Sequence, residues 1–376
     1  MIDNNFHIVN LGEKHLAPII KVVRTTCNLR CPYCFYEGSQ SSRLEVMDEQ
    51  VLEIILKRFF DMPSKNVQFF WHGGEPLLAG IPFYEKIIQT QKSLSQQHII
   101  KNSLQTNGTL IDSTWAKFFK ENHFGVGVSL DGPQHIHDLV RVNANGNGSF
   151  KQVMDGISTL RQEGMETGVI AVINSNSVKY PKELFSFFYK NRLSFSANDC
   201  VSGESEPQSV KELAVNPRDY AVFLLEILDL WLETGDTNFK VKPLEDFIHG
   251  VMGQKPQLCK FSGSCYRYIT VDINGDIYPC HEYLNQQFLL GNLVEMPLGE
   301  IIKSSRYQQY YAGRGETKLT CGQCKWLQVC QGWCMRSWNG KNAINDLSEH
   351  QTCEMLQYLF EEISQKLRKF GYKTIN

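Results

Sequence analysis

The sequence predicts an α/β protein: a partial (β/α)6 barrel of the TIM type, followed by a small cysteine-rich α+β domain. Strand-like and helix-like segments alternate about six times, which implies parallel strands joined by right-handed crossovers. Glycine-rich and polar motifs recur where the expected strands end, which is where (β/α) barrels carry their chemistry. From residue 259 onward the apolar periodicity is weak, and cysteines and glycines are frequent. A doubly wound open sheet is the alternative architecture.

The expected strands and helices follow from the spacing of apolar residues. Residues 17–24 are a short apolar run bounded by polar residues, which predicts a strand. Residues 48–61 place Val51 and Ile55 on one face after Asp48, a suitable N-cap, which predicts a helix. By the same criteria the further strands are 67–71, 99–104, 124–130, 168–173 and 193–198. The further helices are 83–97, 112–121, 150–163, 182–190, 218–234 and 354–369.

Two regions of different texture are expected. Residues 1–235 are expected to form the barrel, and residues 236–376 a linker helix and the cysteine-rich domain. The polar stretch 201–216 lies near the change, and the amphipathic helix 218–234 is expected to serve as a packing linker. Because the first strand is expected near residue 18, no separate leader-binding domain is expected before the barrel.

Composition excludes several classes of protein. The chain has 376 residues, of which 42% are hydrophobic and 21% charged, as in ordinary globular proteins. A formal net charge of −2 gives no electrostatic reason to expect a nucleic-acid partner. No apolar run approaches the roughly 20 residues that span a bilayer, and no signal peptide is evident. We therefore expect a cytoplasmic protein without a membrane partner.

Three closely spaced cysteines follow the first expected strand. Cys27, Cys31 and Cys34 are separated by four and three positions. Such a trio can ligate three irons of a cubane cluster and leave the fourth iron open. A zinc site would require a fourth ligand nearby, but His15 lies twelve residues upstream of Cys27. The trio therefore predicts an iron–sulfur cluster whose open iron binds another molecule.

Eight further cysteines form a second group, and only Cys200 stands alone. Grouped thiols in a cytosolic chain are typical of metal ligands rather than of disulfides. Eight ligands suit two closed four-cysteine sites, which predicts two auxiliary iron–sulfur clusters for electron transfer or structure. Two zinc sites are the alternative, since they need the same ligand count. The eight are Cys259, Cys265, Cys280, Cys321, Cys324, Cys330, Cys334 and Cys353.

Two other elements suit a bound small molecule. Gly73-Gly74-Glu75-Pro76 ends a strand, where glycine lets the backbone approach a ligand and carbonyl or Glu oxygens accept bonds from an ammonium group. Ser129 and Arg141 are donors that suit a carboxylate or a ribose. Taken alone, the first element is an ordinary turn and the second an ordinary pair of surface or capping residues.

Together these motifs resemble a known family. The C-x3-C-x2-C trio and the Gly-Gly-Glu-Pro element resemble the radical SAM superfamily, in which S-adenosylmethionine (SAM) binds the open iron. The later cysteine pattern resembles a SPASM domain with two auxiliary clusters. Residues 103–112 and 128–133 look closest to the anaerobic sulfatase-maturating enzymes and related maturases of ribosomally made peptides. The resemblance implies three [4Fe-4S] clusters and SAM as cofactors.

The same resemblance assigns roles position by position. The SAM cluster would be held by Cys27, Cys31 and Cys34. Contacts to SAM would come from Tyr33, Gly73, Gly74, Glu75, Ser129 and Arg141. The first auxiliary cluster would be held by Cys259, Cys265, Cys280 and Cys334. The second would be held by Cys321, Cys324, Cys330 and Cys353.

One position departs from the sulfatase-maturating enzymes. These enzymes carry an Asp after the residue that matches Cys280, and this Asp takes a proton from the substrate. Here His281 and Glu282 follow Cys280. Neutral histidine is a competent general base near pH 7, so His281 is the expected base and Glu282 the alternative. A further alternative is that His281 only forms hydrogen bonds near the cluster.

The resemblance implies an oxidoreductase that modifies a polypeptide after translation. A 5′-deoxyadenosyl radical would take hydrogen from a side-chain carbon, and the excess electron would leave through the auxiliary clusters. The change from Asp to His281 favours an oxidative crosslink, cyclophane-like or thioether, in a ribosomally made precursor peptide. Formylglycine formation from Cys or Ser in a sulfatase is the first alternative, and a non-catalytic iron–sulfur or zinc module is the second. The expected partners are the peptide or protein substrate and an electron donor such as flavodoxin or ferredoxin.

Overall fold

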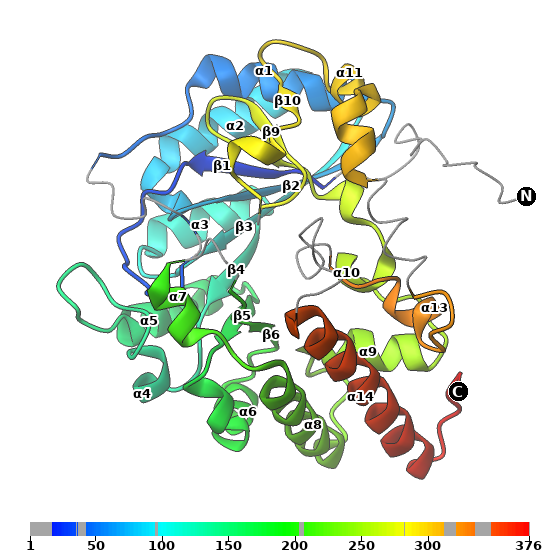
Figure 1. Cartoon of the computed structure of the whole chain (residues 1–376). Helices are drawn as coiled ribbons and strands as arrows, with labels where there is room; N and C mark the ends of the chain where they lie inside the picture. Colours follow the sequence, from blue (N-terminus) through cyan, green and yellow to red (C-terminus); the bar gives the residue numbers. More distant parts are fainter. Residues whose placement is uncertain are drawn as a thin grey trace, which may run out of the picture.

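A ten-stranded sheet organises the structure, a computed structural model that describes residues 17–34, 36, 43–94, 97–202, 207–281, 283–311, 321–334 and 347–375 (Figure 1). The strand order is β10-β9-β8-β1-β2-β3-β4-β5-β6-β7, and β1 to β6 run parallel to their neighbours. The six central strands are β1 (Ile19–Val23), β2 (Asn66–Gly73), β3 (Ile99–Thr106), β4 (Gly125–Ser129), β5 (Gly168–Ile173) and β6 (Phe195–Asp199). These bounds and this order confirm the predicted α/β fold with six barrel strands.

Helices alternate with these strands and cover one face of the sheet (Figure 1). All residues of β1 are buried, whereas β2, β4 and β5 alternate buried with exposed or half-buried residues. This alternation indicates that one face packs on helices while the other lines the interior of the curved sheet. The helices are α1 (Glu49–Phe60), α2 (Ile81–Leu94), α3 (Ser113–Glu121), α4 (Gln134–His137), α5 (Phe150–Gln162) and α6 (Pro181–Lys190).

The later part of the chain extends the same sheet at both edges. At one edge, β7 (Val241–Lys242) pairs parallel with β6. At the other edge, β8 (Thr270–Val271) pairs parallel with β1, and β9 (Asp276–Tyr278) and β10 (Gly291–Asn292) continue antiparallel. These strands were not predicted, because two or three residues carry no readable periodicity. The sheet therefore includes strands from both sides of residue 235, and the domain division at that residue stays a prediction.

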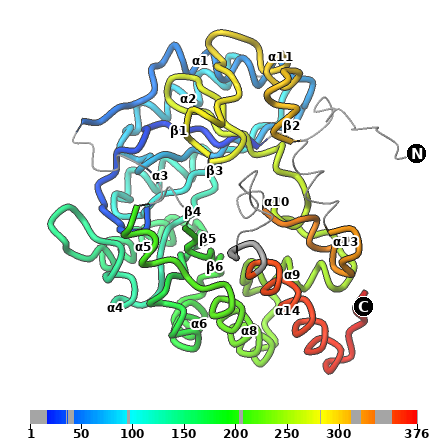
Figure 2. The backbone as a smooth tube through the Cα atoms, viewed as in Figure 1, coloured from blue at the N-terminus to red at the C-terminus, as the bar shows by residue number. Residues whose placement is uncertain are grey.

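The C-terminal helix packs beside the barrel. Helix α8 (Pro217–Thr234) contacts α6 and α14 (Leu347–Lys369), and α14 also contacts α9 (Leu244–Val251) (Figures 1 and 2). Lys366 Nζ lies 2.6 Å from Asp229 Oδ1 and joins α14 to α8. The remaining short helices are α7 (Gln208–Leu213), α10 (Cys259–Ser262), α11 (Leu298–Lys303) and α13 (Leu327–Cys330). A search of the described helices finds none long and apolar enough to cross a membrane.

Candidate active site

The three N-terminal cysteines lie in the loop that follows β1, and each is half-buried. The backbone N–H of Cys34 donates to the carbonyl of Cys31 at 3.0 Å. Burial is the main reason that the pKa of Cys27 is raised to about 11 and that of Cys31 to about 12, and the neighbouring thiol of Cys34 contributes to both shifts. The three thiols therefore lie within electrostatic reach of one another, as ligands of one cluster must.

The Gly-Gly-Glu motif packs against the backbone that leads into the cysteine loop. A Cβ atom on Gly73 would lie 2.1 Å from the Val23 carbonyl oxygen, and one on Gly74 would lie 2.1 Å from the Thr26 carbonyl oxygen. The N–H of Glu75 donates to that same Thr26 oxygen at 2.8 Å. Only glycine permits such close approach of two backbones. The motif therefore fixes the position of the backbone that leads into the cysteine loop relative to the end of β2.

The Glu75 side chain points into the protein. It is fully buried, and its oxygens accept hydrogen bonds from Leu77 N, Thr106 Oγ1 and Asn107 N at 2.7 to 3.0 Å. Burial raises the pKa of this carboxyl group to about 7, and the three donors oppose the shift. The sequence predicts that backbone carbonyl or Glu75 oxygens of this motif accept bonds from an ammonium group. In the structure the side chain instead ties the end of β2 to the end of β3.

Tyr33 and Arg141 both contact the carboxylate of a third residue, Asp131. The Tyr33 hydroxyl donates to Asp131 Oδ2 at 2.5 Å, and Arg141 Nε lies 3.0 Å from the same oxygen. The guanidinium carbon lies 5.5 Å from the centre of the Tyr33 ring. Burial disfavours the charge on Arg141, but attraction to Asp131 prevails and raises its pKa. Arg141 opposes the rise in the pKa of Cys31, and Tyr33 packs with Cys31, so this buried cluster adjoins the cysteine loop.

Ser129 and Asn107 lie at neighbouring strand ends. The Ser129 hydroxyl, at the end of β4, accepts a hydrogen bond from Gln105 Nε2 at 3.0 Å. Asn107, just past β3, donates through Nδ2 to Asn28 Oδ1 at 2.8 Å and approaches Cys27 Sγ at 3.7 Å. Donors near a ligand sulfur stabilise its negative charge, so Asn107 belongs to the surroundings of the expected cluster.

Four of the later cysteines gather at a second place. A hydrogen bond with Cys265, then burial, hold the pKa of Cys259 well above its ordinary value. The thiols of Cys265, Cys334 and Cys280 add to this shift. This is the grouping that the family resemblance implies for the first auxiliary cluster.

The other four gather at a third place. Cys321, Cys324, Cys330 and Cys353 line one small cavity together with Trp326, Leu327, Leu356, Gln357 and Phe360. Burial is the main reason that the pKa of Cys330 is raised to about 12, and the other three thiols contribute to the shift. Within the described ranges, no three His, Cys, Asp or Glu side chains are arranged to hold a single metal ion. The donor set of each place, three or four thiols, fits the ligands of an iron–sulfur cluster.

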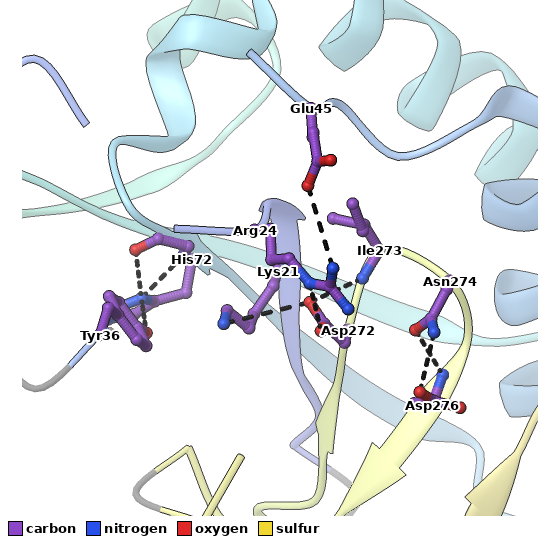
Figure 3. Close-up of polar contacts among 10 residues, drawn as sticks. Lys21, Arg24, Tyr36, Glu45, His72, Asp272, Ile273, Asn274 and Asp276 are labelled. Carbon is purple, nitrogen blue, oxygen red and sulfur yellow. Dashed lines mark hydrogen bonds and ion pairs between the residues drawn. The ribbon is translucent and has the colours of Figure 1, made fainter. Parts of the chain in front are cut away.

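His281 lies between the first auxiliary group and the barrel interior. Its Nδ1 is 3.7 Å from Cys280 Sγ, and its ring centre is 6.1 Å from that of His72 on β2. His72 Nδ1 accepts from the Gly73 N–H, and the Tyr36 hydroxyl lies 2.9 Å from the same nitrogen (Figure 3). The alternative base, Glu282, lies outside the described residues.

A buried lysine completes this side of the barrel. Lys21 is opposite His72 in the β1–β2 pairing, and its ammonium group lies 4.4 Å from the centre of the Tyr36 ring. Burial lowers the pKa of Lys21 to about 8, while the nearby Asp272 opposes this shift (Figure 3). No sequence motif marks Lys21, Tyr36 or His72 as a site residue. The available signal was the lone charge of Lys21 in an otherwise apolar strand.

Comparison with known proteins identifies the family. The radical SAM superfamily matches residues 22–188, and the SPASM iron–sulfur cluster-binding domain matches residues 259–325. A cysteine-type anaerobic sulfatase-maturating enzyme of Clostridium novyi is 33% identical over 362 residues, which cover 94% of this chain and 96% of that enzyme. The chain is a radical SAM enzyme with a SPASM domain.

Further relatives of this radical SAM enzyme can be aligned with nearly its whole length. A serine-type anaerobic sulfatase-maturating enzyme of Bacteroides thetaiotaomicron is 30% identical over 372 residues, covering 93% of this chain and 90% of that enzyme. The solved structure described as "Native anSMEcpe with bound AdoMet and Cp18Cys peptide" has a TM-score of 0.84 at 28% identity, with 95% and 99% of the two chains covered. As a radical SAM enzyme with a SPASM domain, the chain uses SAM and iron–sulfur clusters.

Proposed function

We propose that this radical SAM enzyme oxidises a side chain within a peptide or protein substrate. The observation that carries the proposal is the match of fold and length to a maturase structure described with both AdoMet and a peptide. When bound, the cluster and SAM supply a carbon-centred radical that removes a hydrogen atom from the substrate. The chain's own residues hold these groups, exclude water and accept the proton that the oxidised side chain releases.

The relatives favour formylglycine as the product. Sulfatase-maturating enzymes of both the cysteine and the serine type match more than nine tenths of this chain. Formylglycine formation requires loss of two electrons and two protons from a Cys or Ser side chain, followed in the Cys case by hydrolysis. This outcome now stands ahead of the crosslink that the sequence favoured.

A peptide crosslink is the second candidate, and His281 favours it. The sulfatase-maturating enzymes resembled by this chain carry an Asp where His281 stands, so the proton acceptor has changed while the cysteines have not. His281 adjoins Cys280 and His72, close to where the barrel meets the first auxiliary group. A substrate with a different reacting carbon is the simplest reason for a different base.

The substrate experiment separates the two products. The anaerobically reconstituted enzyme is incubated with SAM, a reductant, and peptides that carry Cys, Ser or spaced aromatic residues. Formylglycine is expected to give an aldehyde that reacts with a hydrazide probe. A crosslink would instead give a peptide lighter by two hydrogen atoms, without an aldehyde and with joined fragment ions. SAM cleavage without any change in all peptides would argue against the proposal.

Substitution of His281 tests the base. His281→Ala is expected to abolish product while SAM is still cleaved, because the radical forms but the substrate proton has no acceptor. His123→Ala, on the loop before β4, is the matched control and is expected to keep turnover. Full product formation by His281→Ala would refute this role and leave Glu282 as the candidate.

We further propose that eleven cysteines hold three [4Fe-4S] clusters, which corresponds to about twelve irons per chain. Cys324→Ala is expected to lower the iron content to about eight, because it breaks one four-cysteine site. Cys200→Ala is the control for the four-cysteine site that contains Cys324, because Cys200 packs with Tyr33 and Val140, beside Cys31 of the trio, and its loss is expected to leave that site's iron in place. Equal iron loss in both variants would contradict the division of ligands.

A further inference from the structure

His137 is a fully buried histidine to which neither the family resemblance nor the comparisons assign a role. It ends α4, the short helix between β4 and α5. Its Nδ1 accepts a hydrogen bond from the backbone N–H of Asp131 at 3.2 Å. Its Nε2 lies 2.9 Å from the Ser149 hydroxyl. Because an amide N–H can only donate, Nδ1 is unprotonated, and the ring hydrogen is on Nε2 and donates to Ser149.

Ser149 connects His137 to the backbone of Arg141. Its hydroxyl donates to the Arg141 carbonyl oxygen at 2.8 Å, and its backbone N–H donates to the same oxygen at 3.1 Å. Ser149 occupies the N-cap position of α5, where a serine hydroxyl usually bonds the first turn of the helix, yet its side chain makes no capping bond. The hydroxyl therefore does not cap its own helix but connects His137 with Arg141.

These contacts close a ring, which we call the His137 bridge: Asp131 N–H, the His137 ring, the Ser149 hydroxyl and the Arg141 carbonyl. The ring is completed on its other side by the ion pair between the Arg141 and Asp131 side chains. Burial lowers the pKa of His137 to about 4, with Asp131 opposing and Arg141 adding to the shift. The imidazole is therefore neutral near pH 7, as its two hydrogen bonds require.

The bridge holds the backbone of Arg141, and the ion pair with Asp131 holds its guanidinium group. Nε faces Asp131, which is itself held by the Tyr33 hydroxyl and by the N–H of Val172. Among the described residues, the two terminal nitrogens of Arg141 donate no hydrogen bond to a protein acceptor, although Arg141 is only 6% exposed. These nitrogens are not among the buried, unpartnered atoms of the described residues, so they keep access to solvent and can donate to a ligand beside Cys31.

We propose that His137 is a positioning residue for SAM binding, acting through Arg141. Loss of the bridge would leave the ion pair intact but release the backbone of Arg141 from that of Asp131. The terminal nitrogens would then sample several orientations. Binding the SAM carboxylate would have to restrict them to one, and this loss of conformational entropy would weaken the affinity for SAM. This inference rests on the contact between Arg141 and SAM that the family resemblance implies, which we propose here as well, and it is independent of the substrate.

The test measures the dissociation constant of SAM for the reconstituted holoenzyme without peptide, together with iron content and thermal unfolding. His137→Phe is expected to weaken SAM binding about tenfold, a typical effect of losing a buried hydrogen-bonded link, with iron content unchanged. His137→Asn keeps an acceptor for Asp131, and His137→Gln keeps a donor for Ser149. Each is expected to recover part of the affinity. His135→Ala, on the same helix but exposed and paired with Glu183, is the control and should bind SAM normally.

A double-mutant cycle distinguishes positioning from a general structural role. In an Arg141→Ala background, His137→Phe is expected to change SAM affinity less than twofold, because the group it positions is gone. Equal effects in both backgrounds would overturn the proposal, as would unchanged affinity in His137→Phe. If Arg141→Ala itself binds SAM normally, the assigned SAM contact fails. If Arg141→Ala weakens binding but His137→Phe does not, only the His137 bridge fails.

Discussion

Lys21 of β1 and Asp272, which follows β8, meet inside the protein with 4.0 Å between Nζ and Oδ1. Both side chains are almost fully buried, and the exposed Arg24 reaches the same carboxylate at 3.2 Å (Figure 3). Asp272 therefore neutralises two cations from the first strand region of the barrel. The pair fastens the later, cysteine-rich part of the chain to the strand that leads into the cysteine loop.

Replacing Asp272 should be costly. Asp272→Asn is expected to destabilise the folded protein by about 3 kcal/mol, since it leaves the Lys21 charge buried without a countercharge. Glu45→Gln removes the second, exposed carboxylate near Arg24 and is expected to cost less than about 0.5 kcal/mol. Chemical unfolding of the two variants under anaerobic conditions measures the difference. Similar stability for both would show that Lys21 does not depend on Asp272.

Gly74 should be irreplaceable for the cysteine loop. Gly74→Ala places a Cβ atom 2.1 Å from the Thr26 carbonyl oxygen, so the loop must move. We expect iron content to fall from about twelve to about eight atoms per chain and SAM cleavage to be lost. Gly168→Ala is the matched control, because its Cβ would meet no atom within 4 Å. Iron analysis and spectroscopy of the two variants check this, and a full set of clusters in Gly74→Ala would contradict it.

Asn107 should influence the reduction potential of the SAM cluster. Asn107→Leu removes a donor near Cys27 Sγ, so the more negative reduced state is stabilised less. A weak hydrogen bond of about 0.7 kcal/mol corresponds to a potential lower by about 30 mV for one electron. An anaerobic redox titration, following the signal that SAM perturbs, measures the shift. Asn191→Ala, at the C-terminal end of α6, is the control and should leave the potential unchanged. A higher potential in Asn107→Leu would show that Asn107 does not stabilise the reduced cluster.

His137 should make the enzyme sensitive to acid. Because burial lowers its pKa to about 4 from an ordinary value of 6.5, the unfolded chain binds the proton first as pH falls. The stabilisation is complete above pH 6.5 and is lost progressively between pH 6.5 and 4, by about 2 kcal/mol at pH 5. Thermal unfolding of wild type and His137→Phe at several pH values measures this. The variant is expected to show a flatter pH dependence, and parallel curves would be inconsistent with a buried neutral imidazole.

Much of the fold was predictable because its signals are local. Apolar residues at strand and helix periods predicted all six barrel strands within a few residues, and Asp48 accepts hydrogen bonds from Gln50 and Val51 as the expected N-cap of α1. The final helix begins at Leu347 rather than near residue 354, because its first turns are polar and carry no apolar stripe. The two-residue strands β7, β8 and β10 depend on pairing with distant strands, which no local pattern reports.

The amino-acid sequence by itself determined the chemistry available to this protein: a cysteine trio short of one ligand, eight further cysteines and alternating strands and helices. Residue type and spacing are properties of the chain, so these features needed no coordinates. Only the tertiary structure decided that Glu75 turns inward, that Lys21 meets Asp272 and that His137 links Asp131 to Arg141. The physical reason is that burial and hydrogen-bond partners are set by segments far apart in the chain, brought together by the curved sheet.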